Sequence, residues 1–127
     1  MVHAIATASI FQTEDPEKVR RALLNLFPSA EVMEREGEMT ASTDDLSRFK
    51  ELIRNHRILD STRRVLLNGL ADGKTSFLLN KQAAFVGKVS FAEGRSPMGP
   101  MTVVIMSDDM EKTIDDIAPR TVDGEIP

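Results

Sequence analysis

The order of strand-like and helix-like segments limits the fold of this 127-residue chain more than any other sequence feature. Read from the N-terminus, the patterns predict a strand, a helix, two strands, two helices, three strands and a final helix. Parallel strands are usually joined by a crossover helix, and here the predicted strands outnumber the helices that could make such connections, so most pairings should be antiparallel. We therefore expect an α+β fold with a mixed, largely antiparallel sheet and helices packed on one face.

The elements of the N-terminal half are bounded by residues with strong positional preferences. Asp15 followed by Pro16 predicts a helix start, because the carboxylate can accept a backbone N–H and proline fits the first helical position. Glu36-Gly37 is typical of a hairpin turn. The predicted elements are a strand over residues 3–11, a helix from Pro16 to Phe27, and hairpin strands over residues 30–34 and 38–42.

The C-terminal half supplies the remaining elements. Its apolar residues follow a helical period that changes register after Ile58, which favours two helices, or one kinked helix, over a single straight one. His56 falls on the predicted inner side of this segment. The predicted elements are helices between Thr43 or Asp44 and Asn68, strands at Thr75–Leu79, Phe85–Phe91 and Met101–Met106, and a helix from Asp108 to Pro119.

Length and composition predict one domain without a membrane segment. We expect a single α+β domain over residues 1–118 and a flexible tail over residues 119–127. No apolar run approaches the ~20 residues that cross a bilayer, and the first residues lack the basic segment of a signal peptide. The chain has no cysteine, which excludes disulfides and thiolate chemistry and favours a cytoplasmic location.

Basic residues are concentrated in the middle of a chain whose net charge is −4. The stretch from Leu46 to Arg95 contains ten Lys or Arg against four Asp or Glu, whereas the rest contains six against sixteen. This asymmetry predicts an anionic partner, and the planar donors of guanidinium groups match phosphate oxygens. The predicted contact residues are Arg54, Arg57, Arg63, Arg64, Lys74, Asn80, Lys81, Gln82, Lys88 and Arg95. The alternative is an ordinary solvated helix face on which the arginines pair with Glu51 and Asp60.

Three short motifs that could carry other chemistry lack the required context. Gly73-Lys74-Thr75 resembles the end of a phosphate-binding P-loop, but the first glycine is absent and a helix precedes it, so a turn is predicted. Lys81–Lys88 overlaps the aromatic strand of the RNA-recognition motif without the aromatic residues that stack bases. His3 and His56 have no partners placed to complete a catalytic triad. We predict no metal, no cofactor and no enzymatic activity.

Three longer segments carry a family resemblance, and with TEDPEKV (Thr13–Val19) and Phe27-Pro28 it covers nearly the whole chain to about Ile105. They are RILDSTRRVLLNGL (Arg57–Leu70), FLLNKQAAFVGKVSFAE (Phe77–Glu93) and SPMGPMTVVI (Ser96–Ile105). They resemble the archaeal family of uncharacterised proteins described as predicted RNA-binding or exosome-associated. The resemblance implies a fold similar to the large-subunit ribosomal protein that binds 5S RNA, and it implies no catalytic residue.

The leading hypothesis is a non-enzymatic, cytoplasmic RNA-binding protein that contacts phosphates through the basic residues named above. Its predicted partners are RNA, a second copy of the chain and an RNA-processing complex, without a membrane. The main alternative is a protein-interaction or scaffolding module, or a dimerising accessory subunit, that uses the edge of the strand Met101–Met106. A third hypothesis is an enzyme of coenzyme A or nucleotide metabolism, which requires a pocket that gathers Asn80, Lys81, Gln82 and His56 or an acid.

Overall fold

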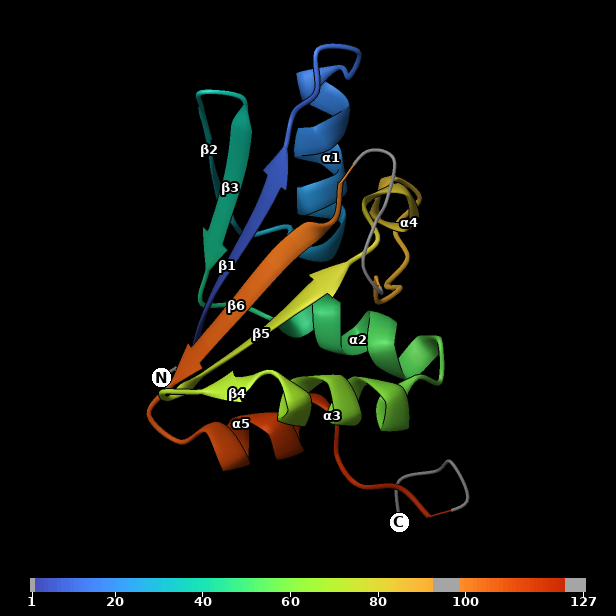
Figure 1. Ribbon diagram of the computed structural model, residues 1–127. Coiled ribbons are helices and arrows are strands. Elements are labelled where there is room, and N and C mark those ends of the chain that lie inside the picture. Colours follow the sequence, from blue (N-terminus) through green and yellow to red (C-terminus); the bar gives the residue numbers. More distant parts are fainter. Residues whose placement is uncertain (1, 93–98, 123–127) are drawn as a thin grey trace.

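The protein folds into one antiparallel sheet with helices on one of its faces (Figure 1). The computed structural model describes residues 2–92 and 99–122. The strands are β1 (Val2–Ser9), β2 (Glu31–Arg35), β3 (Glu38–Thr43), β4 (Leu70–Ala71), β5 (Lys74–Leu79) and β6 (Met101–Ser107). The helices are α1 (Pro16–Leu26), α2 (Ser47–Asn55), α3 (Leu59–Asn68), α4 (Lys81–Phe85) and α5 (Met110–Ile117). The six strands lie in the order β2-β3-β1-β6-β5-β4.

The sheet separates a packed face from an open face. Ala4, Ala6 and Ala8 of the central strand β1 are 1–2% exposed, because their small side chains let the helices approach the sheet closely. On the other face Thr7 pairs with Thr40 of β3 and with Thr102 of β6, and these three side chains are partly or fully exposed. The predicted α+β class is confirmed, and every strand pairing in the described residues is antiparallel.

Phenylalanine rings connect the helices to the sheet. Phe27 after α1 stacks on Phe49 of α2 with a centroid distance of 5.4 Å, and Phe49 stacks on Phe77 of β5 at 6.0 Å. Phe91 meets Phe77 edge-on at 5.8 Å. Aromatic pairs in these geometries add to the stabilisation that burial alone provides. The rings therefore link the C-terminal end of α1 and helix α2 to strand β5.

The helix termini follow the predicted chemistry with small shifts. Asp15 caps α1 by accepting the backbone N–H of Glu17, as predicted. The start of α2 was expected at Thr43 or Asp44, but the Asp45 carboxylate accepts the N–H of Ser47 instead. Helix α5 is capped by Asp109 rather than by Asp108.

The predicted break in the second helical segment is real and lies at the α2–α3 turn. Arg57 has a φ of 55°, so the backbone passes through the left-handed region and the two helices separate there. This turn also carries His56 to the surface. The expectation that His56 lies on the inner side of a helix was therefore wrong.

The predicted strand Phe85–Phe91 is absent, and a short helix, α4, ends at Phe85. Asn80 caps this helix by accepting the N–H of Ala83, and two alanines favour the helical turn. Residues 86–90 are irregular, and Phe91 makes a single bridge to Leu79. The sixth strand is the two-residue β4, which pairs with the start of β5.

Two predicted segments, a loop and the C-terminal tail, lie partly outside the described residues. Most of the predicted Gly94–Pro100 loop and the last five residues of the predicted tail lie outside them. Within residues 119–122, the Thr121 hydroxyl donates to the Asp60 carboxylate of α3. Among the described residues, no helix has the length and apolar character needed to cross a membrane.

Candidate nucleic-acid interface

Two of the four predicted arginines of the α2–α3 segment, Arg54 and Arg63, are engaged with α5. Arg63 Nη1 donates to the Asp115 carboxylate at 2.7 Å and to the Ala118 carbonyl at 3.0 Å. Arg54 donates to the Asp116 carbonyl at 3.2 Å, and Lys50 pairs with the Asp116 carboxylate at 2.8 Å. These cations therefore hold the C-terminal end of α5 against α2 and α3.

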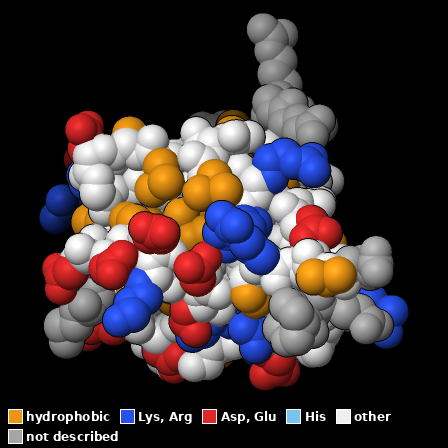
Figure 2. All heavy atoms as spheres, turned by 90° about the horizontal axis from the view of Figure 1, so that it is seen from below, with side chains coloured by type: hydrophobic (Ala, Val, Ile, Leu, Met, Phe, Trp, Pro, Cys, Tyr) orange, Lys and Arg blue, Asp and Glu red, His pale blue; other side chains and the backbone are white. Residues whose placement is uncertain are grey.

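The surface around α5 carries both signs of charge. Figure 2 views the molecule from this side and shows acidic and basic side chains interspersed. One hollow here is lined by Lys50, Arg54, Glu51 and Asp116, and a second by Arg63, Arg120, Glu111 and Asp115. Each hollow pairs its cations with carboxylates, which repel a phosphate. The predicted arginines on this side do not form a single basic patch.

Four other predicted basic residues are exposed and make no ion pair with the described residues. Arg57 occupies the α2–α3 turn, Arg64 lies on α3, and Lys74 begins β5 beside Asp72 of the β4–β5 turn. Lys88 follows α4. Arg95 lies outside the described residues. The structure thus distributes the predicted contacts over several elements.

Lys81 is buried beneath the surface on which it was predicted to act. Its side chain is 0% exposed, and Nζ donates to the Ser9 carbonyl at 2.7 Å and to Glu14 Oε1 at 3.0 Å. The same Glu14 oxygen accepts the N–H of Phe11, whose ring centroid lies 5.2 Å from Nζ. The predicted contact of Lys81 with phosphate is therefore wrong, because the ammonium joins the β1–α1 connection to α4.

A different basic hollow lies between α1 and α4. Lys18, Arg21 and Phe85 line a hollow of about 370 Å³, and none of the described carboxylates contributes to its lining. Both cations are exposed and make no ion pair with the described residues, while the Phe85 ring is half-buried. We call this set of three residues the α1–α4 hollow. It combines positive charge with an aromatic ring, the two features that bind single-stranded nucleic acid.

A side chain of α1, Asn25, holds α4 beside the α1–α4 hollow. Asn25 Nδ2 donates to the carbonyls of Ala84 at 2.9 Å and Phe85 at 3.3 Å, at the C-terminal end of α4. Lys18, Arg21 and Asn25 are spaced by three and four residues, so they share one side of α1. This fixes the position of Phe85 beside the two cations.

The predicted polar residues of the α4 segment divide into two groups. Gln82 and Lys88 are exposed, and Gln82 precedes Phe85 by three residues on the same side of the helix. Asn80 uses its side-chain oxygen to cap α4. Val86, the residue after Phe85 at the end of α4, is 70% exposed. Gln82 and Lys88 thus remain candidates for contact with a ligand, and Asn80 has a structural role.

The sequence prediction missed Lys18 and Arg21 because they lie outside the basic stretch from Leu46 to Arg95. A signal was present in the sequence, since their spacing places them on one helix side with Asn25. The contact with Phe85 depends on the fold and carries no local signal. Within the described part of the chain, no group of His, Asp or Glu is arranged to hold a metal ion.

Comparison with known proteins gives consistent similarities. A family model described as RNA binding matches residues 3–107, a range that ends before α5. A UPF0201 protein of Methanopyrus kandleri is 45% identical over 95% of this chain and 87% of its own length. A UPF0201 protein of Metallosphaera sedula is 37% identical over 98% of this chain and 92% of its own.

Solved structures extend the similarity to the fold. The crystal structure of a UPF0201 protein from Methanococcus jannaschii matches with a TM-score of 0.91 and 41% identity, covering 98% of both chains. These similarities carry no link to the exosome or to the 5S-RNA-binding ribosomal protein, and both links stay predictions.

Proposed function

The chain belongs to the family described as RNA binding and is a relative of the archaeal UPF0201 proteins, and from this premise we propose that it binds single-stranded RNA without catalysing a reaction. The observation that carries the proposal is the α1–α4 hollow, in which the described lining residues are two cations and an aromatic ring. A cytoplasmic location is part of the proposal, because cellular RNA is available there.

Each residue of the α1–α4 hollow has a role that follows from its chemistry. Lys18 and Arg21 contact phosphates, since both are exposed and neither pairs with a carboxylate of the described residues. Phe85 provides a surface on which an unpaired base stacks, which favours single strands over duplexes. Gln82 and Lys88 extend the contact along α4 and the segment after it.

The overall charge sets the expected strength of binding. A net charge of −4 means that most of the surface repels RNA, so attraction is confined to the hollow and its surroundings. The exposed predicted residues Arg57, Arg64 and Lys74 are further candidates for contact with the flanking nucleotides. We expect modest affinity that falls steeply as salt increases.

The proposal is tested by fluorescence anisotropy with single-stranded RNA, structured RNA and duplex DNA at two salt concentrations. The test variant is Lys18→Ala/Arg21→Ala, and a second variant, Phe85→Leu, removes the ring but keeps an apolar side chain. The matched control is Lys112→Ala/Arg120→Ala, which removes two exposed cations elsewhere. Far-UV circular dichroism confirms that each variant is folded.

Each outcome decides between the proposal and its alternatives. We expect salt-sensitive binding to single-stranded RNA that both test variants weaken about tenfold or more, corresponding to a loss of at least about 1.4 kcal/mol, while the control binds like wild type. Equal weakening by the control would show that binding follows net charge rather than this hollow. No binding to any nucleic acid would overturn the proposal.

A further inference from the structure

The free edge of the sheet at β2 has the features of a docking site for another protein. We propose that β2 and the adjoining open face of β3 bind an extended segment of a partner protein that carries Lys or Arg at alternate positions. The segment adds to the sheet as a further strand beside β2. This inference rests on the hairpin alone and does not depend on RNA binding.

The backbone of β2 is available along its outer side. Strand β2 is at the end of the sheet and pairs with β3 alone among the described elements. Glu36 and Gly37 have φ values of 48° and 80°, as in a tight two-residue hairpin turn. In antiparallel pairing, alternate residues direct their N–H and C=O groups away from the partner strand. With the register that joins Arg35 to Glu38, these residues are Val32 and Glu34.

The opposite edge of the sheet lacks this capacity. Strand β4 has two residues, whereas β2 has five. An added strand gains affinity from a row of backbone hydrogen bonds, and two residues supply too few. The edge at β2 is thus the one of the two described edges that is long enough to accept a strand.

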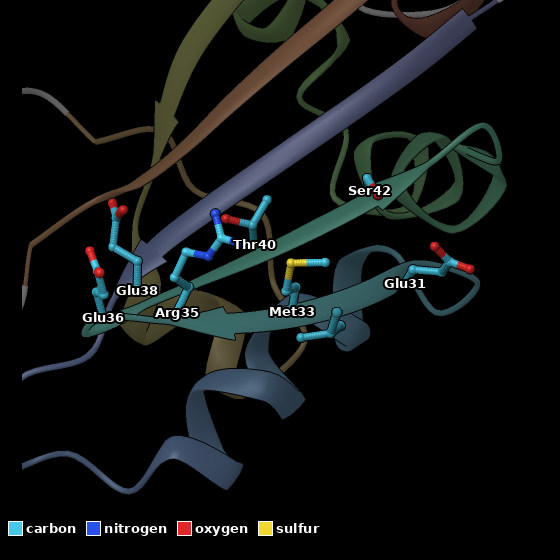
Figure 3. Close-up of a pocket in the computed structure, with 8 residues that line it drawn as sticks. Glu31, Met33, Arg35, Glu36, Glu38, Thr40 and Ser42 are labelled. Atoms are coloured by element: carbon cyan, nitrogen blue, oxygen red, sulfur yellow. The ribbon is translucent and has the colours of Figure 1, made fainter.

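A hollow of about 600 Å³ lies on the open face next to this edge (Figure 3). Its sides are formed by alternate residues of β2 and β3, including Met33, Thr40 and Ser42. The Met33 side chain is 64% exposed on a strand whose other exposed side chains are charged. A flexible thioether of this kind adapts to different apolar partners. The hollow therefore offers an apolar contact beside the free backbone groups.

Charge selects the class of partner. The hairpin carries Glu31, Glu34, Glu36 and Glu38 against the single cation Arg35. All five are exposed, and none makes an ion pair with the described residues. This field repels RNA and also repels the same hairpin of a second copy of the chain. It attracts a basic strand, because a lysine or arginine on the open face can lie across from Glu31 of β2, and opposite charges across neighbouring strands are stabilising.

The site is distinct from the α1–α4 hollow. Figure 1 shows the β2–β3 hairpin and α4 on opposite sides of the central strands β1 and β6. A protein segment on β2 and RNA on α1 and α4 would therefore occupy separate surfaces. The chain could then join a basic protein to an RNA, if both proposals hold.

The probe is an acetylated and amidated seven-residue peptide that alternates Lys with Thr or Val. Binding is measured by isothermal titration calorimetry, and the contact surface by NMR chemical shifts of the backbone amides. Two control peptides are matched to it: one has proline in place of the central Val, and one has Glu in place of every Lys. We expect shifts centred on Val32 and Glu34 with the lysine peptide and none with either control.

Variants separate the backbone contribution from the charge contribution. Glu34→Pro removes one outward N–H at an exposed edge position, where proline is tolerated, and we expect the dissociation constant to rise at least tenfold. Glu31→Gln/Glu38→Gln keeps the backbone and should weaken binding and reduce its salt dependence. Glu111→Gln/Asp115→Asn, which removes two acids on α5, is the matched control and should bind like wild type.

Several results would overturn the proposal. They are no detectable binding of the lysine peptide at millimolar concentration, equal binding of the proline-containing peptide, and amide shifts located away from β2. Sedimentation of the free protein as a dimer that Glu34→Pro dissociates would make a second copy the occupant instead. RNA affinity measured on the same variants should not fall, so failure of this proposal is distinguishable from failure of RNA binding.

Discussion

The two sides of the helical layer use their basic residues for different purposes. Around α5, Arg54, Arg63 and Lys50 bind carboxylates and backbone carbonyls of the C-terminal helix. Between α1 and α4, Lys18 and Arg21 face solvent beside Phe85 and have no carboxylate partner among the described residues. The first arrangement stabilises the fold, and the second leaves charge available to a ligand. A count of cations along the sequence does not distinguish them.

The largest expected effect tests the buried ammonium of Lys81 on α4. Lys81→Ala leaves the Glu14 carboxylate buried without its ammonium partner, and breaking such a pair costs about 3–5 kcal/mol. Urea denaturation of the variant should show this loss. Lys88→Ala, an exposed base seven residues later, should change stability by less than about 0.5 kcal/mol.

A second variant distinguishes the ion pair from simple loss of side-chain volume. Lys81→Met/Glu14→Gln removes both charges but retains an oxygen that accepts the Phe11 N–H. We expect the double variant to be more stable than Lys81→Ala, because no unpaired charge remains buried. If Lys81→Ala is as stable as wild type, the buried pair contributes nothing.

The next largest effect is the loss of stability expected when Arg63, which contacts α5, is replaced. Arg63→Ala removes hydrogen bonds to Asp115 and to the Ala118 carbonyl from a side chain that is 15% exposed. Hydrogen bonds to charged groups contribute about 1.5–3 kcal/mol, and unfolding by urea should report a loss of that size. Its neighbour Arg64 is exposed, so Arg64→Ala should leave the stability nearly unchanged. Arg63→Ala should bind RNA like wild type, and weaker binding by the folded variant would contradict its structural role.

A smaller effect is expected on the salt dependence of RNA affinity when Lys18 of the α1–α4 hollow is replaced. Lys18→Ala should leave the unfolding midpoint unchanged and lower the slope of log affinity for single-stranded RNA against log salt by about 0.7, the value for one phosphate contact on a single strand. Arg120→Ala, an exposed cation beyond α5, is the control and should keep the wild-type slope. An unchanged slope in Lys18→Ala would remove this lysine from the interface.

Local signals in the sequence predicted much of the fold. Asp15 with Pro16, and Glu36 with Gly37, determine the conformation within a few residues, and both elements are confirmed. The four consecutive apolar residues from Ala83 to Val86 are compatible with either a strand or a helix, so periodicity alone could not decide between the two. The Asn80 cap decided it in favour of the helix α4.

The roles of the basic residues were less predictable, because they depend on partners far away in sequence. Lys81 pairs with Glu14 across 67 residues, and Arg63 pairs with Asp115 across 52. Nothing in the local pattern separates these cations from Arg64 or Lys88, which remain exposed. The sequence could therefore indicate an excess of positive charge, but only the fold determines which charges face solvent.

The smallest effect concerns the carboxylate at the start of α2, on the side of the helical layer that serves stability. Hydrogen bonds lower the pKa of Asp45. The largest contribution comes from the Ser47 hydroxyl, the next from the Ser47 backbone N–H, and a further one from the Ser29 hydroxyl. A carboxyl whose pKa is lower in the folded state stabilises the protein above its unfolded-state pKa. That contribution is lost as the pH falls through the folded-state pKa.

Urea unfolding midpoints between neutral pH and about pH 3 measure this contribution, since the pKa of an unperturbed Asp is about 3.9. Ser47→Ala removes the hydroxyl donor and should reduce the part of the acid-induced loss that Asp45 causes. Asp45→Asn should abolish that part, because the amide does not titrate in this range. RNA affinity near neutral pH should be the same in all three proteins, since Asp45 and Ser47 lie outside the α1–α4 hollow. If Asp45→Asn loses stability on acidification as steeply as wild type, other carboxylates account for the acid sensitivity, and the bond from Ser47 to Asp45 makes no pH-dependent contribution.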